Sequence, residues 1–468
     1  MGGPVGYKGA NGDRVEVMVT DQPVLPSMPE PSESAPLAAP ATRPGEARVV
    51  RPVRNQIEWA PRELDAAVPP DHPVRAIWAF IERLDLSSFY ADIKVVADRP
   101  GRPASDPRVL LALWVFATVE GVASARRLAR LSEEHDAYRW IRGGVPVDYH
   151  LLADFRVAHQ AAMDQLLTGI VAAMMAENLV TLKRVAQDGM RVRASAGAAS
   201  FRGADSLNQC LAEANDQVER LTHERDQPGP RRSRRQQAAQ ERAAQDRQAR
   251  VERALVLLPQ VQAAKQRQER TLATPRREKV AEPRVSSTDP EARVMHMPDG
   301  GFRPAFNVQL AADTASQVIV GVAISNRGSD QGEALPMEAQ IKGRTSAHPG
   351  EYLMDGGFVK RDDITTLEQA GVTVYAPLRP PRTATSGRTA TTPRPDDSPE
   401  MIAWRQRMGT DQAKEIYKER AATAECVNAQ CRLRGVQQFR VRGLAKTLSV
   451  MLLVAITHNL LRWIALSQ

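Results

Sequence analysis

The feature that most constrains the fold is a change of pattern near residue 183, where a helical period gives way to short apolar runs typical of strands. Upstream segments such as "HPVRAIWAFIERLDLSSFY" repeat apolar residues every three or four positions. Downstream, "LKRVAQDGMRVRA" reads as one strand, and "AFNVQLAADTASQVIVGVAIS" reads as a hairpin around "ADTAS". The chain therefore joins an all-helical part to a strand-containing part.

The second half predicts a mixed sheet. Two further short strands, in "EYLMDGGFV" and "GVTVYAPL", flank a helical segment. We therefore predict an α/β (α+β) fold, with an all-α domain over 55–182 and a mixed sheet with flanking helices over 183–203 and 285–468. The segment 204–284, rich in Gln, Arg, Glu and Ala, predicts a charged helical insertion, either one long helix or a helical pair broken near 226–230.

Two segments have compositions typical of chain without a packed core. Residues 1–54 are rich in Pro, Ala, Ser and Glu and lack an apolar period, so we expect a disordered tail. Residues 379–399 are rich in Pro, Thr and Arg, and we expect a flexible linker there, within the second domain.

The charge balance favours a polyanionic partner such as nucleic acid, because the net charge is +8 and the pI is near 9.6. Three cysteines make no disulfide framework, and the N-terminus lacks a signal pattern, so we expect a cytoplasmic protein. The apolar run over 450–456 is too short to cross a bilayer, and we expect no membrane partner. The sequence contains no Gly-Lys-Ser/Thr phosphate loop and no His-Glu-x-x-His motif, which argues against an ATPase or a zinc peptidase.

Two aspartates follow apolar runs and precede glycine. Asp188 ends "VAQD" and Asp355 ends "EYLMD". At the ends of adjacent strands these carboxylates would converge at one sheet edge, where they repel each other unless cations lie between them. Oxygen ligands of this kind suit Mg²⁺ or Mn²⁺. The alternative interpretation is a pair of structural loop caps, because Asp-Gly is a common turn pair.

A third acid lies in the C-terminal helical segment "EIYKERAATAECVNAQCRLRG". We favour Glu425 there, although Glu415 and Glu419 are rival acids on the same helix. Three polar residues, at offsets of +3, +7 and −8 from Glu425, share its helical face: Asn428, Arg432 and Tyr417. The alternative interpretation is a solvated face without function.

Six motifs occur in the order found in DDE transposases of bacterial insertion sequences: "VAQDGMRVRASAG", "SSTDPEARVM", "AFNVQLAADTASQVIVGVAISNRGSD", "YLMDGGF", "IYKERAATAECVNAQCRLRG" and "QFRVRGLAK…AITHNLLR". The helical stretch from "DHPVRAIW" to "DYHLLADFR" resembles the N-terminal domain of the same family. The resemblance covers about residues 55–200 and 285–466. It implies an RNase H-like catalytic domain behind a helical transposase domain.

The resemblance also implies site residues. It assigns Asp188, Asp355 and Glu425 as catalytic, metal-binding residues. It places three further residues in a basic-aromatic signature around the Glu: Tyr417, Arg420 and Arg432. In the best-known form of this signature the step from Arg to Glu is four positions, whereas the step from Arg420 to Glu425 is five, and Arg432 stands where Lys is more usual.

The predicted function is cutting and joining of DNA. Two Mg²⁺ or Mn²⁺ ions, about 4 Å apart, would serve hydrolysis at the element end and attack of the freed 3′-hydroxyl on target DNA. The expected partners are double-stranded DNA and further copies of the chain, as a homodimer or higher oligomer on DNA. Two alternatives stay open: a non-catalytic DNA-binding relative, and a metal-dependent nuclease of the same fold.

The predicted DNA contacts come from two regions. In "EGVASARRLARLSEEHDAYRW", a candidate helix-turn-helix, they are Arg126, Arg127 and Arg130. A solvated basic face is the alternative there. Around the third acid, the candidates are Tyr417, Arg420, Asn428 and Arg432.

Overall fold

The computed structural model describes residues 63–94, 103–226, 234–271, 282–378 and 389–467. The predicted tail over 1–54 lies outside these residues. Everything from residue 62 onward belongs to one unit by its internal contacts, so the boundaries drawn between the helical, sheet and insertion domains stay predictions.

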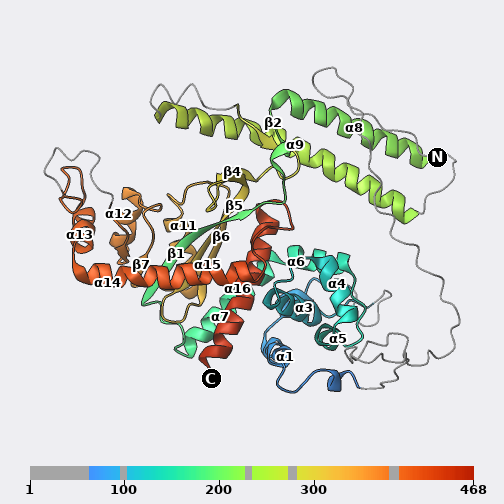
Figure 1. Cartoon of the computed structure of the whole chain (residues 1–468), viewed down its shortest axis with the longest axis horizontal. Coiled ribbons are helices and arrows are strands. Elements are labelled where there is room, and N and C mark those ends of the chain that lie inside the picture. Colours follow the sequence, from blue (N-terminus) through green and yellow to red (C-terminus); the bar gives the residue numbers. More distant parts are fainter. Residues whose placement is uncertain (1–62, 95–102, 227–233, 272–281, 379–388, 468) are drawn as a thin grey trace, which may run out of the picture. The chain divides into compact units, whose positions relative to one another are not determined.

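The first part is helical, as its period predicts. Short polar side chains cap several helices: Asp106, Ser124 and Asp148 each accept a hydrogen bond from a backbone N–H in the first turn. The described elements are η1 (Asp65–Ala67), α1 (Pro73–Arg83), α2 (Ser87–Tyr90), α3 (Pro107–Val119), α4 (Ala125–Glu134), α5 (Asp136–Arg142), α6 (Tyr149–Ala158) and α7 (Gln160–Ala176). Helix α3 is buried on almost all sides and forms the centre of this part (Figure 1).

A mixed sheet follows, which confirms the predicted strands and hairpin. Strand β1 pairs antiparallel with β5 and parallel with β7, and β7 pairs parallel with β8, while β5 also pairs antiparallel with β4 and β6. The strands of this sheet are β1 (Arg184–Arg193), β4 (Arg293–His296), β5 (Phe302–Asp313), β6 (Ile319–Ser325), β7 (Glu351–Leu353) and β8 (Thr373–Tyr375). Helices α11 (Ala334–Thr345) and α12 (Arg361–Gln369) lie between these strands in sequence.

One local prediction is wrong: Asp188 does not end a strand. Strand β1 continues through Asp188 and Gly189 to Arg193, because β5 supplies an antiparallel partner along this whole length. The parallel neighbour β7 stops earlier, at Leu353 opposite Ala186. Asp188 therefore lies inside a strand but beyond the end of the strand beside it.

The two faces of the sheet are covered by different helices. One face includes Gly321, and a methyl group there would lie 2.3 Å from the Met337 sulfur of α11, so α11 lies directly on this face. The other face, which carries Asp188, packs against the C-terminal helices. These are α13 (Pro399–Met408), α14 (Asp411–Arg420), a π-helical turn (Ala421–Glu425), α15 (Cys426–Leu433) and α16 (Leu444–Leu466) (Figure 1).

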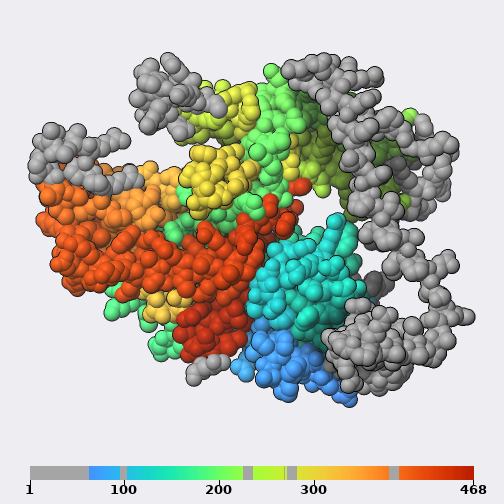
Figure 2. Space-filling model, viewed as in Figure 1, coloured from blue at the N-terminus to red at the C-terminus, as the bar shows by residue number. Residues whose placement is uncertain are grey.

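The charged segment between the first strand and the hairpin forms two helices, the second of the two arrangements expected for it. Helices α8 (Ala204–Asp226) and α9 (Arg234–Thr271) pack together beside the short strands β2 (Phe201–Arg202) and β3 (Val285–Ser286). A small apolar cluster holds the pair: Leu207, Val251, Ala254, Leu258 and Val285. Figure 2 shows the two helices as a separate green and olive arm of the molecule.

Part of the predicted linker is packed. Residues 379–388 lie outside the described residues, but Asp397 in the later part accepts a 2.6 Å hydrogen bond from the Arg405 guanidinium and lies 3.1 Å from that of Arg361. Arg405 also donates to the carbonyl oxygen of Ala390. A buried ion pair with Arg405 of α13 and a partly exposed one with Arg361 of α12 thus hold Asp397, while the flexible linker over 379–399 stays a prediction.

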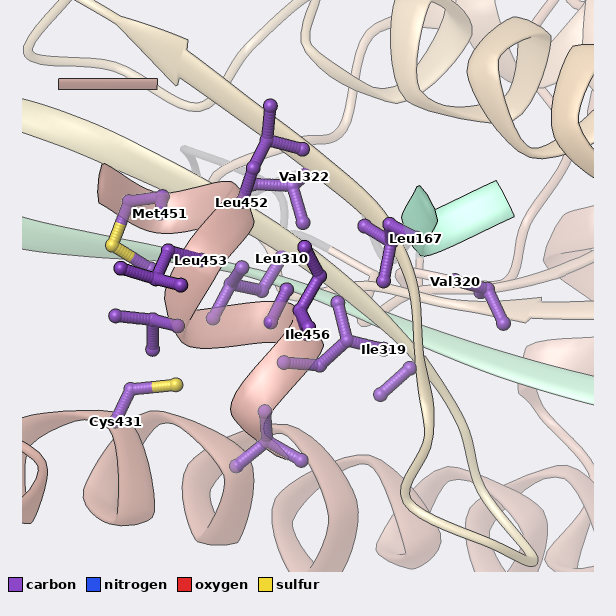
Figure 3. Packing of buried hydrophobic residues seen from close by; sticks show 14 of the residues in the cluster. Leu167, Leu310, Ile319, Val320, Val322, Cys431, Met451, Leu452, Leu453 and Ile456 are labelled. Atoms are coloured by element: carbon purple, nitrogen blue, oxygen red, sulfur yellow. The ribbon is translucent and has the colours of Figure 1, made fainter. Parts of the chain in front are cut away.

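Helix α16 joins the helical part to the sheet. It packs against α3, α6 and α7 on one side and against β6 on the other. Figure 3 shows Met451, Leu452, Leu453 and Ile456 among apolar side chains of β5 and β6. By length and hydropathy this helix could cross a membrane, contrary to the expectation from the sequence, but 67% of its apolar window is buried inside the protein, as in a core helix.

Two polar residues of α16 attach it to the hairpin. Asn459 is fully buried, and its side chain both accepts from the N–H and donates to the C=O of Ile319, at 2.8 Å each. His458 bonds the carbonyl oxygen of Gln317 at 2.7 Å, and burial lowers the pKa of His458 to about 4. Buried backbone groups that the hairpin leaves open are thereby satisfied.

We expect Asn459→Ala to lower the free energy of unfolding by about 2–4 kcal/mol, because it leaves a buried N–H and a buried C=O without partners. Denaturant titration of the whole chain measures this. Thr457→Val is the matched control, since the Thr457 hydroxyl donates to Leu453 of its own helix. Equal losses in the two variants would contradict the capping role of Asn459.

Candidate active site

The two aspartates meet because of the strand register. Ala186 of β1 pairs with Leu353 of β7, and two residues further along both chains stand Asp188 and Asp355. The strands run parallel, so these positions correspond across the sheet. The register thus brings together two of the three predicted carboxylates, which stand 167 residues apart in the sequence.

Asp188 is largely buried and closely surrounded. Its Oδ1 accepts from the Gly189 N–H at 2.9 Å, its Oδ2 accepts from the Asn428 side-chain amide at 3.0 Å, and the Arg420 guanidinium lies 3.8 Å away. Burial raises the pKa of Asp188 to about 6. The charges of Asp355 and Asp330 add to the rise, while Arg420 and the Gly189 N–H oppose it.

Asp355 stands two residues beyond β7, in a turn. Its Oδ1 accepts from the Gly357 N–H at 2.7 Å, so the loop-cap interpretation describes part of what this side chain does. A methyl group at Gly357 would lie 2.9 Å from the same oxygen, which leaves little room for a larger residue. The glycine therefore lets the backbone come close to a carboxylate that also acts electrostatically on Asp188.

The third predicted acid, Glu425, shares an arginine with Asp188. The Arg420 guanidinium lies 3.3 Å from Glu425 Oε1 as well as 3.8 Å from Asp188 Oδ1. The side chain of Glu425 is 64% exposed, whereas that of Arg420 is only 14% exposed. Arg420 also lies over the ring of Tyr417, 5.8 Å from its centroid. One buried cation thus links Asp188 to Glu425.

The unusual spacing between Arg420 and Glu425 has a structural cause. Residues Ala421–Glu425 form a π-helical turn, in which one turn holds more residues than in an α-helix. A five-residue step across such a turn keeps both side chains on one face of the helix. The extra residue relative to the usual signature is therefore absorbed locally, and Glu425 stays beside Arg420.

The rival acids on α14 have other partners. Glu415 pairs with Lys418 at 2.6 Å, and Glu419 pairs with Arg184. Within the described part of the chain, neither shares a cation with Asp188. The contacts therefore favour Glu425 as the third acid of the site.

The structure leaves several predicted residues apart from this cluster. Arg432 is exposed, one to two turns beyond Glu425 on α15. Three arginines of α4 lie at the surface of the helical part: Arg126, Arg127 and Arg130. Arg126 lies over the Tyr149 ring, and Arg130 pairs with Glu134 on the surface. Their assignment to DNA stays a prediction.

A buried polar network beneath the site was not predicted. Asp330 Oδ1 accepts from the side-chain amides of Asn307 and Gln309, at 2.7 Å each, and Gln309 Oε1 accepts from Gln187 at 2.9 Å. Tyr352 of β7 donates to Gln187 at 2.7 Å. The sequence signal was available, because Asn307 and Gln309 alternate along an otherwise apolar strand, where buried amides need partners.

The donor set fits a divalent cation in part. Asp188 and Asp355 supply carboxylate oxygens, and Asn428 Oδ1 is buried beside them without a hydrogen-bond partner among the described residues. Hard cations prefer such oxygen donors. Across the described ranges, however, no three acidic, His or Cys side chains stand close enough together to hold a metal ion. Glu425 faces Arg420 instead.

Two family models match the chain. A transposase domain (DUF772) matches residues 62–158, in the helical part, and a transposase DDE domain matches residues 377–464, which include α14, α15 and most of α16. Neither a curated protein nor a solved structure matched. Glu425 lies inside the second match, whereas Asp188 and Asp355 lie outside both.

The two matched domains support the function of a transposase. More particularly, they support a DDE transposase of the insertion-sequence type. Enzymes of this family use divalent metal ions. The catalytic roles of individual residues rest on the geometry above.

We expect Gly189→Ala to destabilise the protein by about 1–3 kcal/mol through overpacking. A Cβ at this position would lie 2.1 Å from Asp330 Oδ1 and 2.7 Å from the Gln309 amide. Gly197→Ala is the control, because nothing lies within 4 Å of a Cβ there. Thermal unfolding of both variants measures the difference, and a neutral Gly189→Ala would show that Asp330 is not held against β1.

We expect the stability of the metal-free protein to fall as pH rises through about 6, because Asp188 has a folded pKa above its unfolded value. Below about pH 4, the ordinary pKa of an aspartate, the carboxyl group is protonated in both the folded and the unfolded state, and the protein has the full stability that this group allows. Asp188→Asn should remove this part of the slope and be more stable than the parent at pH 7 by about 1–3 kcal/mol. Denaturant titrations with a chelator, between about pH 4 and pH 8, measure the free energy of unfolding of both proteins. If this free energy changes with pH in the same way in the parent and in Asp188→Asn, the pKa of Asp188 is not raised.

Proposed function

We propose that this transposase cleaves the phosphodiester bond at insertion-sequence ends and joins the freed 3′-hydroxyl to target DNA, with Asp188, Asp355 and Glu425 as its catalytic carboxylates. The observation that carries the proposal is the geometry of these three groups. Strand register aligns the two aspartates, and Arg420 links Asp188 to Glu425.

We assign the sheet to the RNase H-like class that the family resemblance implies. Three antiparallel strands, β6, β5 and β1, continue into the parallel strands β7 and β8. The aspartates stand on the two central strands or just beyond them, at the sheet edge where the chain leaves β7.

Bound Mg²⁺ or Mn²⁺, two ions in our proposal, would supply Lewis-acid activation of the attacking oxygen and charge stabilisation of the leaving oxygen. Asp188, Asp355 and Glu425 would hold the ions, and the free Oδ1 of Asn428 is a further oxygen donor. Asn428 and the Gly189 N–H orient the Asp188 carboxylate through their hydrogen bonds.

Arg420 has a second role in this proposal. Its Nε is buried without a partner among the described residues, while its terminal nitrogens face two carboxylates. A guanidinium in this state is suited to a phosphate oxygen. With Glu425 holding a cation, Arg420 would be free to contact a phosphate oxygen of the DNA backbone.

Double-stranded DNA is the proposed partner, and a homodimer or higher oligomer is the proposed assembly on it. The surface arginines of α4, together with Arg432 and Tyr417, are the proposed contacts away from the reacting phosphate. We place this activity in the cytoplasm, at the nucleoid.

One observation favours a second candidate. Because no metal-holding group of three such side chains occurs in the described ranges, a DNA-binding relative that does not cut is the alternative. Binding of end DNA in chelator, with no nicking in Mg²⁺, is its signature. Cleavage without joined products would instead identify a nuclease.

The test is cleavage and strand transfer on duplexes that carry the element end. We expect Asp188→Ala, Asp355→Ala and Glu425→Ala each to lower both rates about a hundredfold or more, because a catalytic cation contributes several kcal/mol to the transition state. Chelation should abolish both reactions in the parent protein.

Glu415→Ala is the matched control for the helix acid, since Glu415 pairs with the exposed Lys418 and not with Arg420. It should retain the parent rates. Full activity in any one of the three catalytic variants would refute that residue's assignment, and loss of activity in Glu415→Ala at unchanged stability would reopen the choice of acid.

A further inference from the structure

A cavity lined by charged side chains lies away from the catalytic carboxylates. It has a volume of about 690 Å³, and α6, α9, the start of α16 and the loop before α16 line it. This loop is fixed to the end of β1, because the Phe439 N–H donates to the Arg193 carbonyl oxygen at 2.9 Å.

Six basic and four acidic side chains line the cavity. Three of its basic side chains are exposed and make no hydrogen bond or ion pair within the described part of the chain: Arg440, Arg442 and Lys446. Arg250 of α9 faces them with a buried Nε that has no partner there. Burial and the nearby charge of Arg442 lower the pKa of Arg250, while the charge of Asp246 opposes this.

Two of the four acids that line the cavity, Asp289 and Glu291, accept hydrogen bonds from the first turn of α16; the other two are Asp154 and Asp246. Asp289 accepts from the Gly443 N–H at 3.1 Å, and Glu291 accepts from the Leu444 N–H at 2.8 Å and from Arg253 at 3.2 Å. They cap the first turn of α16 and neutralise Arg253. Arg440, Arg442 and Lys446 keep their donors free for an anion from outside.

We propose that this cavity binds the phosphate backbone of duplex DNA, at a distance from the bond that is cut. Guanidinium groups suit phosphate oxygens, and cations from several elements suit an extended polyanion better than a small ion. The site extends the proposed function and rests on it. It also gives the helical insertion a role in DNA binding, because α9 supplies Arg250 and closes one wall of the cavity.

The distance along β1 places the contact relative to the carboxylates. Ser195, which lines the cavity, lies seven residues after Asp188 in nearly extended chain, or about 20 Å away. Phosphates on one strand of DNA rise about 3.4 Å each along the axis. The cavity therefore grips the backbone about six nucleotides from the reacting phosphate.

The test uses the full-length chain, a fluorescent duplex of about 40 base pairs of mixed sequence, and a chelator, so that binding is measured without cleavage. We expect Arg440→Ala/Arg442→Ala to weaken binding about tenfold at moderate salt and to reduce the slope of log K against log salt by about 2. Both side chains are exposed, and circular dichroism verifies the fold.

The control is Arg220→Ala/Arg242→Ala, two exposed arginines of α8 and α9 that donate to carbonyl oxygens of their own helices. It should leave the salt slope closer to that of the parent, and Arg440→Lys/Arg442→Lys should recover most of the affinity. An unchanged slope in Arg440→Ala/Arg442→Ala overturns the proposal.

Inorganic phosphate, titrated by calorimetry, separates a small-anion pocket from a DNA site. Phosphate binding that is lost in the Arg440→Ala/Arg442→Ala variant, with an unchanged duplex slope, also overturns the proposal. The binding assay requires no catalysis. If the protein binds DNA through this cavity but never cuts it, the proposed function is refuted while the proposed binding site stands.

Discussion

The register of β1 against its neighbours is the constraint on which the site depends. A shift of one residue would turn every side chain of β1 to the opposite face and would separate Asp188 from Asp355. The buried network of Tyr352, Gln187, Gln309 and Asp330 specifies this register, because each amide and carboxylate finds its partner in one alignment only. An apolar strand would pack nearly as well when shifted, whereas a buried amide without a partner is costly.

Arg420 is the electrostatic centre of the same region. Ionisation of Asp188 is costly in a buried site near two other carboxylates, and Arg420 partly offsets this cost. The π-helical turn after Arg420 places Glu425 within reach of the same guanidinium. The site thus holds the negative charge of Asp188 and Glu425 against one guanidinium, that of Arg420.

Helix α16 makes the helical part and the sheet one structure. Its buried stripe packs on β6 and on helices of the first part, and Asn459 bonds to the backbone of the hairpin. The cavity proposed for DNA begins at the first turn of this helix.

The sequence by itself determined the element types, the hairpin and the candidate acids, because these follow from local periodicity and from residue chemistry, but it left open whether the charged insertion is one helix or two. It did not determine that Asp188 lies within a strand, since that depends on the length of β5 beside it. The Asp330 network and the link from Arg420 to Glu425 were likewise decided only by the tertiary structure. They join residues far apart in the chain or across an irregular turn, and no local pattern records such contacts.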